Sequence, residues 1–294
     1  MYIGIDHGTS AIRFSAGEKY FKITREEARN FRWQDLGKLC SPEEITGIAL
    51  TYSMGDGISR ITPIERVEGR GIRSREGAGK HVGGGTRVFD QIRESGLPAV
   101  LIPGLHRNSP TDARFRVYSH QASPEKIGIA YRVSEDLGRD FIVSDVSSNT
   151  VTLLVKDGLI TGGFDACIFA PGLEHGALDV DAIRRVDTAM STANEAFLRA
   201  GVNYTLPESE RLPALALFSA MECAALRILN QGARIALAGS IGPLISRDVS
   251  DLLGSEVEVY DEWCASSGLA LIAKDVFSGK REILGIGVDN VNFL

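Results

Sequence analysis

Cysteine is scarce in this sequence of 294 residues, and the few that occur stand far apart. The four are Cys40, Cys167, Cys223 and Cys264, and none belongs to a Cys-x-x-Cys pair. Disulfide scaffolds and zinc sites use a denser pattern. The five histidines also lack the His-x-x-x-His spacing of a metal-binding helix. We therefore expect reduced thiols and no transition metal held by protein ligands.

Long apolar runs are absent as well. No stretch approaches the roughly 18 residues of a transmembrane helix, and the N-terminus lacks the basic segment and apolar core of a signal peptide. Acidic residues outnumber basic ones by 38 to 32, a net charge of −6, which disfavours broad binding to nucleic acid. We expect a cytoplasmic protein that binds neither membrane nor nucleic acid.

The remaining composition is that of an ordinary globular protein, 44% apolar and 24% charged, and long enough for two domains. One region departs from it. Residues 65–87 are rich in Gly and Arg and lack apolar periodicity. A long loop is the expectation there, and loops of this length are usually functional or disordered.

The chain begins with a short apolar strand that runs into an acid, a glycine and two hydroxyls. Residues 3–10 read Ile-Gly-Ile-Asp-His-Gly-Thr-Ser, and the next seven residues alternate as a return strand would. Asp6, at the strand end, can order a hydrated Mg²⁺. Gly8 allows a tight turn that brings its N–H groups and the hydroxyls of Thr9 and Ser10 toward phosphate oxygens. An ordinary hairpin turn would use the same residue types.

The same design returns in the middle of the chain. Residues 141–145 form an apolar strand that ends on Asp145, and residues 151–155 form the return strand. The turn between them is built from small polar residues, Ser147, Ser148, Asn149 and Thr150. The sequence therefore contains two weakly similar halves, an internal repeat.

The second half adds a glycine motif and helical signals. A buried strand at 235–238 leads into the small, glycine-containing segment Gly239-Ser240-Ile241-Gly242. Residues 214–230 are apolar at helical spacing. Ser123-Pro124 opens a further helix that reaches about Leu137, and residues 263–277 form a last helix. Small residues on the last two, Gly128, Ala265, Gly268 and Ala270, would let two helices approach closely.

In this order the motifs resemble those of the superfamily of acetate and sugar kinases, heat-shock chaperones and actin. Asp6 to Ser10 is similar to its first phosphate motif, Asp145 to Thr150 to its second, and Ala238 to Gly242 to its adenosine motif. Residues 124–137 and 262–277 resemble its two connecting helices. The resemblance implies an α/β, two-lobed actin-like ATPase fold, with duplicated ribonuclease H-like lobes whose mixed sheets are flanked by helices.

The resemblance also implies lobes and roles. Residues 1–138 would form the N-terminal lobe with the first phosphate motif, and residues 139–294 the C-terminal lobe with the other two motifs and the helix 262–277. ATP would lie in the cleft, and Asp6 and Asp145 would act as catalytic residues that order Mg²⁺ through water. The residues implied to hold the nucleotide are Gly8, Thr9, Ser10, Ser147, Ser148, Asn149, Gly239, Ser240 and Gly242.

A second substrate would contact the N-terminal lobe. The candidates that line its site are His7, Arg13, residues 83–87 and residues 172–175. If the acceptor is a hydroxyl, its catalytic base is open, with Asp56 and Asp112 both conceivable. A carboxylate acceptor needs no base, only cations over the two anions, which Arg60, Arg87 or Arg107 would supply.

More narrowly, residues 2–14, 123–131 and 170–179 resemble the archaeal family called methanogenesis marker protein 12. This resemblance implies a methanogen cytoplasm and a kinase-like ATP site, without naming a reaction. Mg-dependent transfer of the ATP γ-phosphoryl to a small carboxylate or hydroxyl substrate is the leading hypothesis. An ATPase that remodels or activates a protein partner is the alternative, followed by a scaffold without turnover. Analogy with carboxylate kinases suggests a homodimer.

Overall fold

The computed structural model describes residues 1–52, 56–72 and 84–291, which fall into two compact units. Unit 1 comprises Met1–Asp136 and Trp263–Leu294, and unit 2 is the uninterrupted stretch Leu137–Glu262. The lobes expected from the sequence place the helix 262–277 in the second lobe, whereas the contacts within the chain group it with unit 1. The division into functional lobes at residue 138 stays a prediction.

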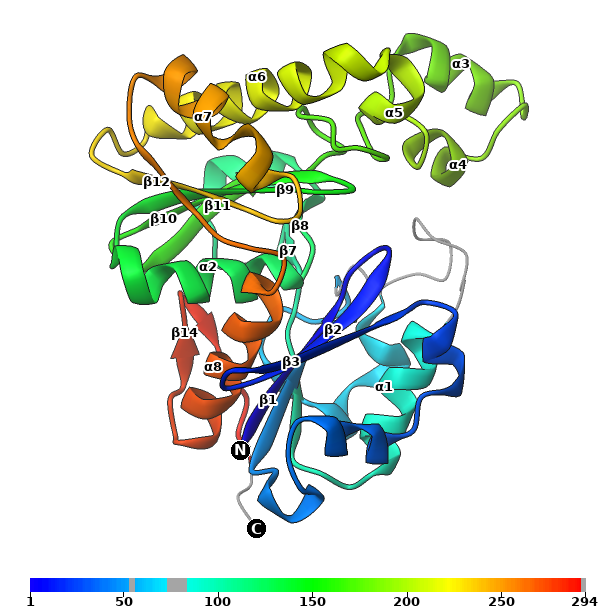
Figure 1. Cartoon of the computed structure of the whole chain (residues 1–294), viewed down its shortest axis with the longest axis vertical. Helices are drawn as coiled ribbons and strands as arrows, with labels where there is room; N and C mark the ends of the chain where they lie inside the picture. Colours follow the sequence, from blue (N-terminus) through cyan, green and yellow to red (C-terminus); the bar gives the residue numbers. More distant parts are fainter. Residues whose placement is uncertain (53–55, 73–83, 292–294) are drawn as a thin grey trace. The chain divides into compact units, whose positions relative to one another are not determined.

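Unit 1 contains a six-stranded sheet in the order β3-β2-β1-β4-β6-β5. Its first three strands are labelled in Figure 1. β1, β4 and β6 run parallel, and the other pairs are antiparallel. The strands are β1 (Tyr2–His7), β2 (Ala11–Ala16), β3 (Lys19–Thr24), β4 (Gly47–Leu50), β5 (Thr62–Pro63) and β6 (Ala99–Leu101). Two short antiparallel pairs accompany it, β7 (Leu105–His106) with β8 (His120–Ala122) and β14 (Glu282–Ile283) with β15 (Ile286–Gly287).

Three α-helices belong to this part of the structure. They are α1 (Gly85–Glu94), α2 (Glu125–Leu137) and α8 (Cys264–Phe277). Short 3-10 turns fill the connections: η1 (Glu27–Asn30), η2 (Trp33–Lys38), η3 (Pro42–Glu44), η4 (Ile64–Arg66), η5 (Glu68–Gly71) and η6 (Ala113–Val117).

The strand β1 shows why its sequence alternates as it does. Ile3 and Ile5 are fully buried in the apolar core of the sheet. On the opposite face a Cβ at Gly4 would overlap the backbone of α8, at Ser266 O and Ala270 N. Only glycine therefore lets this helix lie directly on the strand.

Helices α2 and α8 also approach each other closely through small residues. A Cβ on Gly128 would lie 2.7 Å from Ala265 O, and one on Gly268 would overlap Gly128 O. These are three of the four small residues that suggested a close approach in the sequence. The fourth, Ala270, packs against Gly4 instead.

Unit 2 repeats the strand order of unit 1. Its five-stranded sheet has the order β11-β10-β9-β12-β13, which matches β3-β2-β1-β4-β6 strand for strand (Figure 1). β9, β12 and β13 run parallel, and β10 and β11 antiparallel. The strands are β9 (Phe141–Val146), β10 (Thr150–Lys156), β11 (Leu159–Phe164), β12 (Arg234–Ala238) and β13 (Val257–Val259). The shared order shows the duplicated α/β fold expected from the sequence.

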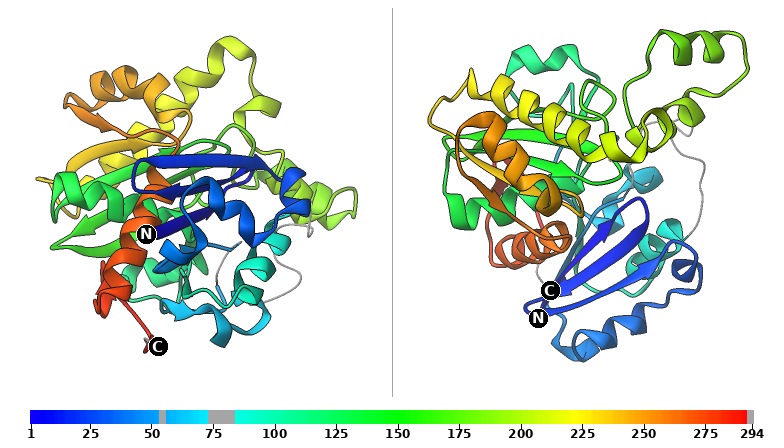
Figure 2. Two further views of the ribbon diagram at one scale, coloured as in Figure 1. Left: turned by 60° about the horizontal axis from the view of Figure 1, so that its bottom comes forward. Right: turned by 45° about the horizontal axis from the view of Figure 1, so that its top comes forward.

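Five helices complete unit 2, namely α3 (Val180–Asp187), α4 (Ala193–Phe197), α5 (Val202–Thr205), α6 (Glu208–Arg227) and α7 (Gly242–Leu253). α6 and α7 lie side by side over the sheet, and α3 and α4 extend away from it (Figures 1 and 2). Leu215, Ala216 and Ala220 of α6 pack into the core with strand and α7 residues.

The apolar spacing at 214–230 correctly predicts a helix, but that helix is apolar on two faces. Leu217, Met221 and Ile228, which stand at helical spacing, are 45%, 46% and 78% exposed. The face toward the sheet uses Leu215, Ser219 and Cys223 instead. Within the described residues, none of the helices combines the length and apolar character needed to cross a membrane. None of the four cysteines belongs to a disulfide, and only Cys167 is exposed.

Candidate functional site

In the first hairpin Asp6 lies near the end of β1, and the hydroxyl side chains of the turn are exposed to solvent. Asp6 pairs with Arg13 in the strand register, is 3% exposed, and lies 3.7 Å from Arg13 (Oδ2 to Nη1). The side chains of Thr9 and Ser10 are exposed and form no hydrogen bond with another described residue. The turn thus presents two unengaged hydroxyls next to a buried carboxylate.

His7 points to the other face of the sheet and holds the start of α1. Its Nε2–H donates to Gly85 O at 3.2 Å, its backbone N–H donates to Thr51 Oγ1 at 3.0 Å, and Arg25 donates to its carbonyl. Burial, followed by the nearby Arg25 charge, lowers the pKa of His7 to about 3. His7 is therefore neutral and serves as a structural link between β1, β4 and α1.

The second hairpin places Asp145 between two strands. Asp145 pairs with Val151 on β10 and with Ala238 on β12, and it is 6% exposed. Gly239 follows β12 with φ +86°, and a Cβ there would overlap Asp145 Oδ1 and lie 2.6 Å from Val146 O. The expected second phosphate motif and adenosine motif thus meet at one point within unit 2, where only glycine fits. Gly242 then begins α7.

Residues 172–175 form a loop that packs behind the second turn. The sequence suggested these residues as part of the lining of a substrate site. Leu173 N–H donates to Ser147 O at 3.0 Å, and the N–H groups of Glu174 and His175 donate to Ser148 O at 2.9 and 3.0 Å. A Cβ on Gly172 would overlap the backbone of Asn149. His175 is buried and stacks on the Phe197 ring. Residues 172–175 therefore fix the turn 147–149 from behind.

Glu222 is the residue of this region that sequence reasoning missed. It is fully buried on α6, accepts from Thr152 Oγ1 at 2.6 Å, and accepts from Ala170 N–H at 3.1 Å. Burial raises its pKa to about 8, although both hydrogen bonds lower it. The available signal was a single charged residue in the otherwise uncharged apolar run 212–226. Glu222 ties α6 to β10 and to the start of the backing loop.

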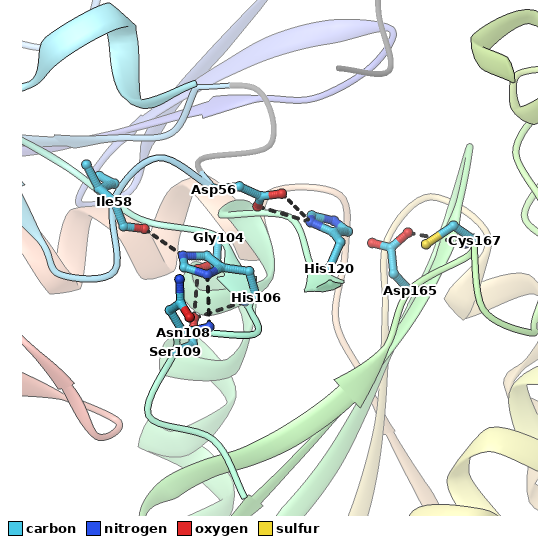
Figure 3. A network of polar contacts seen from close by, with 9 residues as sticks. All are labelled: Asp56, Ile58, Gly104, His106, Asn108, Ser109, His120, Asp165 and Cys167. Atoms are coloured by element: carbon cyan, nitrogen blue, oxygen red, sulfur yellow. Dashed lines mark hydrogen bonds and ion pairs between the residues drawn. The ribbon is translucent and has the colours of Figure 1, made fainter. Parts of the chain in front are cut away.

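The two conceivable acids in unit 1 have different surroundings. Asp112 caps η6 and pairs with Arg114, whose hydrogen bonds lower the pKa of that carboxyl to about 2. Asp56 instead lies 3.1 Å from the Nδ1 of His120 (Figure 3). The Asp112 carboxylate therefore stabilises the local turn, whereas the Asp56 carboxylate is paired with a histidine.

The three arginines considered for a carboxylate acceptor all have protein partners. Arg60 forms an ion pair with Asp289 at 2.6 Å. Arg87 donates to Phe31 O, and Arg107 donates to the carbonyls of η6 residues. Gly83, part of the expected lining 83–87, lies outside the described residues, as do residues 73–82 of the Gly- and Arg-rich stretch.

Oxygen donors dominate both hairpins, and this is the donor chemistry that Mg²⁺ prefers. The two carboxylates, Asp6 and Asp145, belong to different units, so each unit offers one. Across residues 1–52, 56–72 and 84–291, no group of three or more His, Cys, Asp or Glu side chains could hold a metal ion by itself. A carboxylate at the end of a strand is the kind of oxygen donor that suits a hydrated Mg²⁺.

The comparison with protein sequences finds relatives along the whole chain. The UPF0285 protein of the methanogen Methanocaldococcus jannaschii is 47% identical, with 98% of each chain covered. The UPF0285 protein of Methanosarcina mazei is 45% identical over 98% of this chain and 99% of that one. No family model matches the chain.

Among solved structures, two proteins of the ROK family are similar. One is a glucokinase from Streptomyces griseus in complex with glucose and AMPPNP, with a TM-score of 0.50, 12% identity, and 93% of this chain and 99% of that chain covered. The other, from Streptococcus pneumoniae in complex with sucrose, has a TM-score of 0.50, 11% identity, and 92% and 97% covered. The likeness concerns the fold, which is the expected actin-like ATPase fold.

Proposed function

This chain belongs to the UPF0285 family, and from that premise we propose that it binds Mg-ATP and transfers the γ-phosphoryl to a small carboxylate or hydroxyl substrate. One observation carries the proposal. The same strand order occurs twice, and in both units the last but one residue of the first strand is a buried aspartate, shortly before a small polar turn. We further propose that the narrower assignment to methanogenesis marker protein 12, and a place in the cytoplasm of a methanogenic archaeon, apply to this chain.

Within this proposal the two acids share one role. Asp6 and Asp145 order the hydrated Mg²⁺ that accompanies the nucleotide, and both are catalytic in the sense that they act on the reacting phosphate through it. Mg²⁺ supplies charge neutralisation when bound, which is most of what phosphoryl transfer requires. The Arg13 guanidinium beside Asp6 holds that carboxylate in place.

The turn residues hold the phosphates and the glycine motif holds the nucleoside. Hydroxyls, amides and exposed N–H groups of the two turns donate to phosphate oxygens. We expect Gly239, Ser240 and Gly242 to lie beside adenine and ribose, and only glycine fits at position 239, where a side chain would collide with Asp145. The proposed nucleotide-binding residues are Gly8, Thr9, Ser10, Ser147, Ser148, Asn149, Gly239, Ser240 and Gly242.

A specific observation favours the alternative, an ATPase that acts on a protein partner. Leu217, Met221 and Ile228 form an exposed apolar stripe on and just after α6. Exposed apolar surface of this kind is typical of protein–protein contact. A protein client, or a second copy in a homodimer, would find a surface there, and turnover stimulated by a protein rather than by a metabolite would identify this function.

Calorimetric titration of Mg-ATP into the full chain tests the proposal. We expect the wild type to bind, and Asp145→Asn to weaken binding at least tenfold, because the carboxylate next to Gly239 is lost. Asp251→Asn, at an exposed acid on α7 of the same unit, is the matched control and should bind as the wild type does. If the folded wild type bound no Mg-ATP, both the kinase and the ATPase function would be excluded. A scaffold protein without turnover would then be the remaining hypothesis.

A further inference from the structure

A buried acid of unit 2 has no part in the proposed function described above. Glu222, on α6, is completely buried, and its carboxyl group makes two close contacts. One oxygen lies 2.6 Å from Thr152 Oγ1, and the other accepts Ala170 N–H at 3.1 Å. Burial of a carboxyl group costs free energy, and the apolar residues of α6 already attach this helix to the sheet. The position of Glu222 therefore indicates a role other than packing.

The first contact leads toward Asp145. Thr152 Oγ1 is also 2.9 Å from Ser144 Oγ, and both residues are fully buried. Ser144 pairs with Thr152 in the β9–β10 register and directly precedes Asp145. Two hydroxyl groups thus connect the Glu222 carboxyl to the end of the strand that carries the proposed magnesium-ordering acid.

The second contact leads toward the turn itself. Ala170 stands just before the loop 172–175, and this loop donates three N–H groups to the carbonyls of Ser147 and Ser148. Through Ala170, Glu222 holds the start of the segment that supports the second turn. The turn and the strand that precedes it are therefore both connected to this one carboxyl group.

The hydrogen bonds around Thr152 depend on whether Glu222 carries a proton. A hydroxyl group has one proton to donate, and Thr152 has two close oxygen neighbours. When Glu222 is ionised, Thr152 must donate to it and Ser144 must donate to Thr152. When Glu222 is neutral, its O–H donates to Thr152, which then donates to Ser144. The contact between the two hydroxyls has Thr152 as its donor, which is the direction that neutral Glu222 requires.

The surroundings of Glu222 also favour the neutral form. Burial raises its pKa to about 8, and the charge of Asp165 acts in the same direction. The other titratable or charged groups on the strands and helix turns around it are Asp145 on β9, Lys156 on β10, and Cys223 and Arg227 on α6. Lys156 and Arg227 donate to other groups, and across the described parts of the chain no cation forms an ion pair with Glu222. Ionised Glu222 would be a buried charge without a counterion.

We propose that neutral Glu222 is a positioning residue for the second turn, and that loss of its proton loosens the turn and weakens nucleotide binding. Water or a movement of the chain must solvate the unpaired charge, and either change withdraws support from Ala170 and from the loop behind the turn. A less restrained turn loses more conformational entropy when it binds a phosphate. The inference rests on the proposed function and adds regulation by pH to the same site.

The first test reads the proton and needs no nucleotide. Carbon spectra of the full chain, labelled with ¹³C at the glutamate carboxyls, should show a signal that titrates near pH 8 and is lost in Glu222→Gln. A Glu222 signal that titrates below about pH 6 would overturn the proposal, because the acid would then be ionised at neutral pH.

The second test compares the Mg-ATP affinity of the wild type and of Glu222→Gln by calorimetry at pH 6.5 and pH 9. The glutamine amide donates to Thr152 and accepts from Ala170, as the neutral acid does. The two proteins should bind equally within about twofold at pH 6.5. At pH 9 the wild type should bind about three- to tenfold more weakly, because linkage to one proton limits the loss to about tenfold per pH unit above the pKa. The ratio of the two affinities at each pH cancels the titration of the nucleotide.

Glu210→Gln, at an exposed position of the same helix, is the control and should follow the wild type at both pH values. Hydrogen exchange of the wild type adds a readout that depends on no variant. Above pH 8 the protection of the Leu173 and Glu174 amides should fall at least about threefold more than that of the Tyr260 amide, which donates to Leu237 O in the same unit. An equal fall in both would overturn the proposal.

The outcomes distinguish this inference from the proposed function. Absence of Mg-ATP binding by the folded wild type would overturn both. If Mg-ATP binds but the affinity ratio of wild type to Glu222→Gln changes less than threefold between pH 6.5 and pH 9, the role of Glu222 is overturned and nucleotide binding stands.

Discussion

The two hairpins lie in sheets of the same strand order but are held in different ways. The first turn, residues 8–10, is secured by its own strands and by the Arg13–Asp6 pair, and two of its side chains are exposed. The second turn, residues 147–149, has the loop 172–175 behind it through three backbone hydrogen bonds. Glu222 fixes Ala170, just before that loop.

The difference shows that two units with the same strand order can hold their corresponding turns with different rigidity. The second turn is ordered before any ligand arrives, so binding there costs little conformational entropy. The first turn has fewer restraints, so a ligand bound there would cost more conformational entropy. We therefore expect the second turn to be the more rigid of the two turns and the first turn to be the more adaptable.

The largest expected effect distinguishes Gly172, in the loop behind the second turn, from Gly8 in the first turn. Gly172→Ala should lower the free energy of unfolding by about 3 kcal/mol, because its Cβ would overlap the backbone of Asn149. Gly8→Ala should cost less than about 1 kcal/mol, since its nearest neighbour is the flexible end of Arg13, 2.8 Å away. Urea unfolding of both variants measures this, and equal losses would break the comparison.

A second prediction concerns pH and the buried acid beneath the second turn. Glu222 keeps its proton in the folded chain up to about pH 8, whereas the unfolded chain releases it near the ordinary value of 4.5. Between these values the folded state binds one more proton, so its stability falls as pH rises, by about 1.4 kcal/mol per pH unit, and the fall ends above pH 8.

Glu222→Gln cannot titrate and should lack this slope, while it matches the wild type near pH 5, where the acid is neutral. Urea unfolding at pH 5, 6.5 and 8 checks the expectation. Glu210→Gln, at an exposed position of the same helix, is the control and should keep the wild-type slope. If Glu222→Gln kept the wild-type pH dependence of stability as well, Glu222 would not titrate as its burial indicates.

The smallest expected effect concerns the exposed hydroxyls of the first turn. Thr9→Ala and Ser10→Ala should leave the free energy of unfolding within about 0.5 kcal/mol of the wild type, because neither side chain bonds to another described residue. Each should weaken Mg-ATP binding several-fold through a lost hydrogen bond to phosphate. Thermal melting measures the stability of each variant, and calorimetry on the same samples measures its affinity for Mg-ATP. Loss of stability without loss of affinity would count against a phosphate role.

Much of this architecture could be predicted from the sequence because it depends on local pattern. The strand, acid and polar turn of each hairpin are contiguous, and the position of Asp6 and Asp145 at strand ends follows from that spacing. The order of the motifs along the chain was enough to expect the duplicated fold. Gly239 was expected to permit a close approach, although its neighbour proved to be the Asp145 carboxylate.

The remaining features depend on contacts between distant residues, which one sequence does not reveal. The Asp56–His120 pair and the Glu222–Thr152 bond connect residues 64 and 70 positions apart. The stripe through Leu217 and Met221 fits a buried helix face equally well. It faces solvent because α6 also has a second apolar face, and that second face covers the sheet.

The interrupted course of unit 1 has a consequence for the order in which the protein is made. β1 leaves the ribosome first, but α8, the helix that lies on Gly4, follows only after the whole of unit 2. Unit 2 is a single stretch and can finish folding earlier, which reverses the usual sequence of N-terminal before C-terminal. Until Trp263–Leu294 emerges, one face of β1 stays open to water and to whatever chaperones the nascent chain meets.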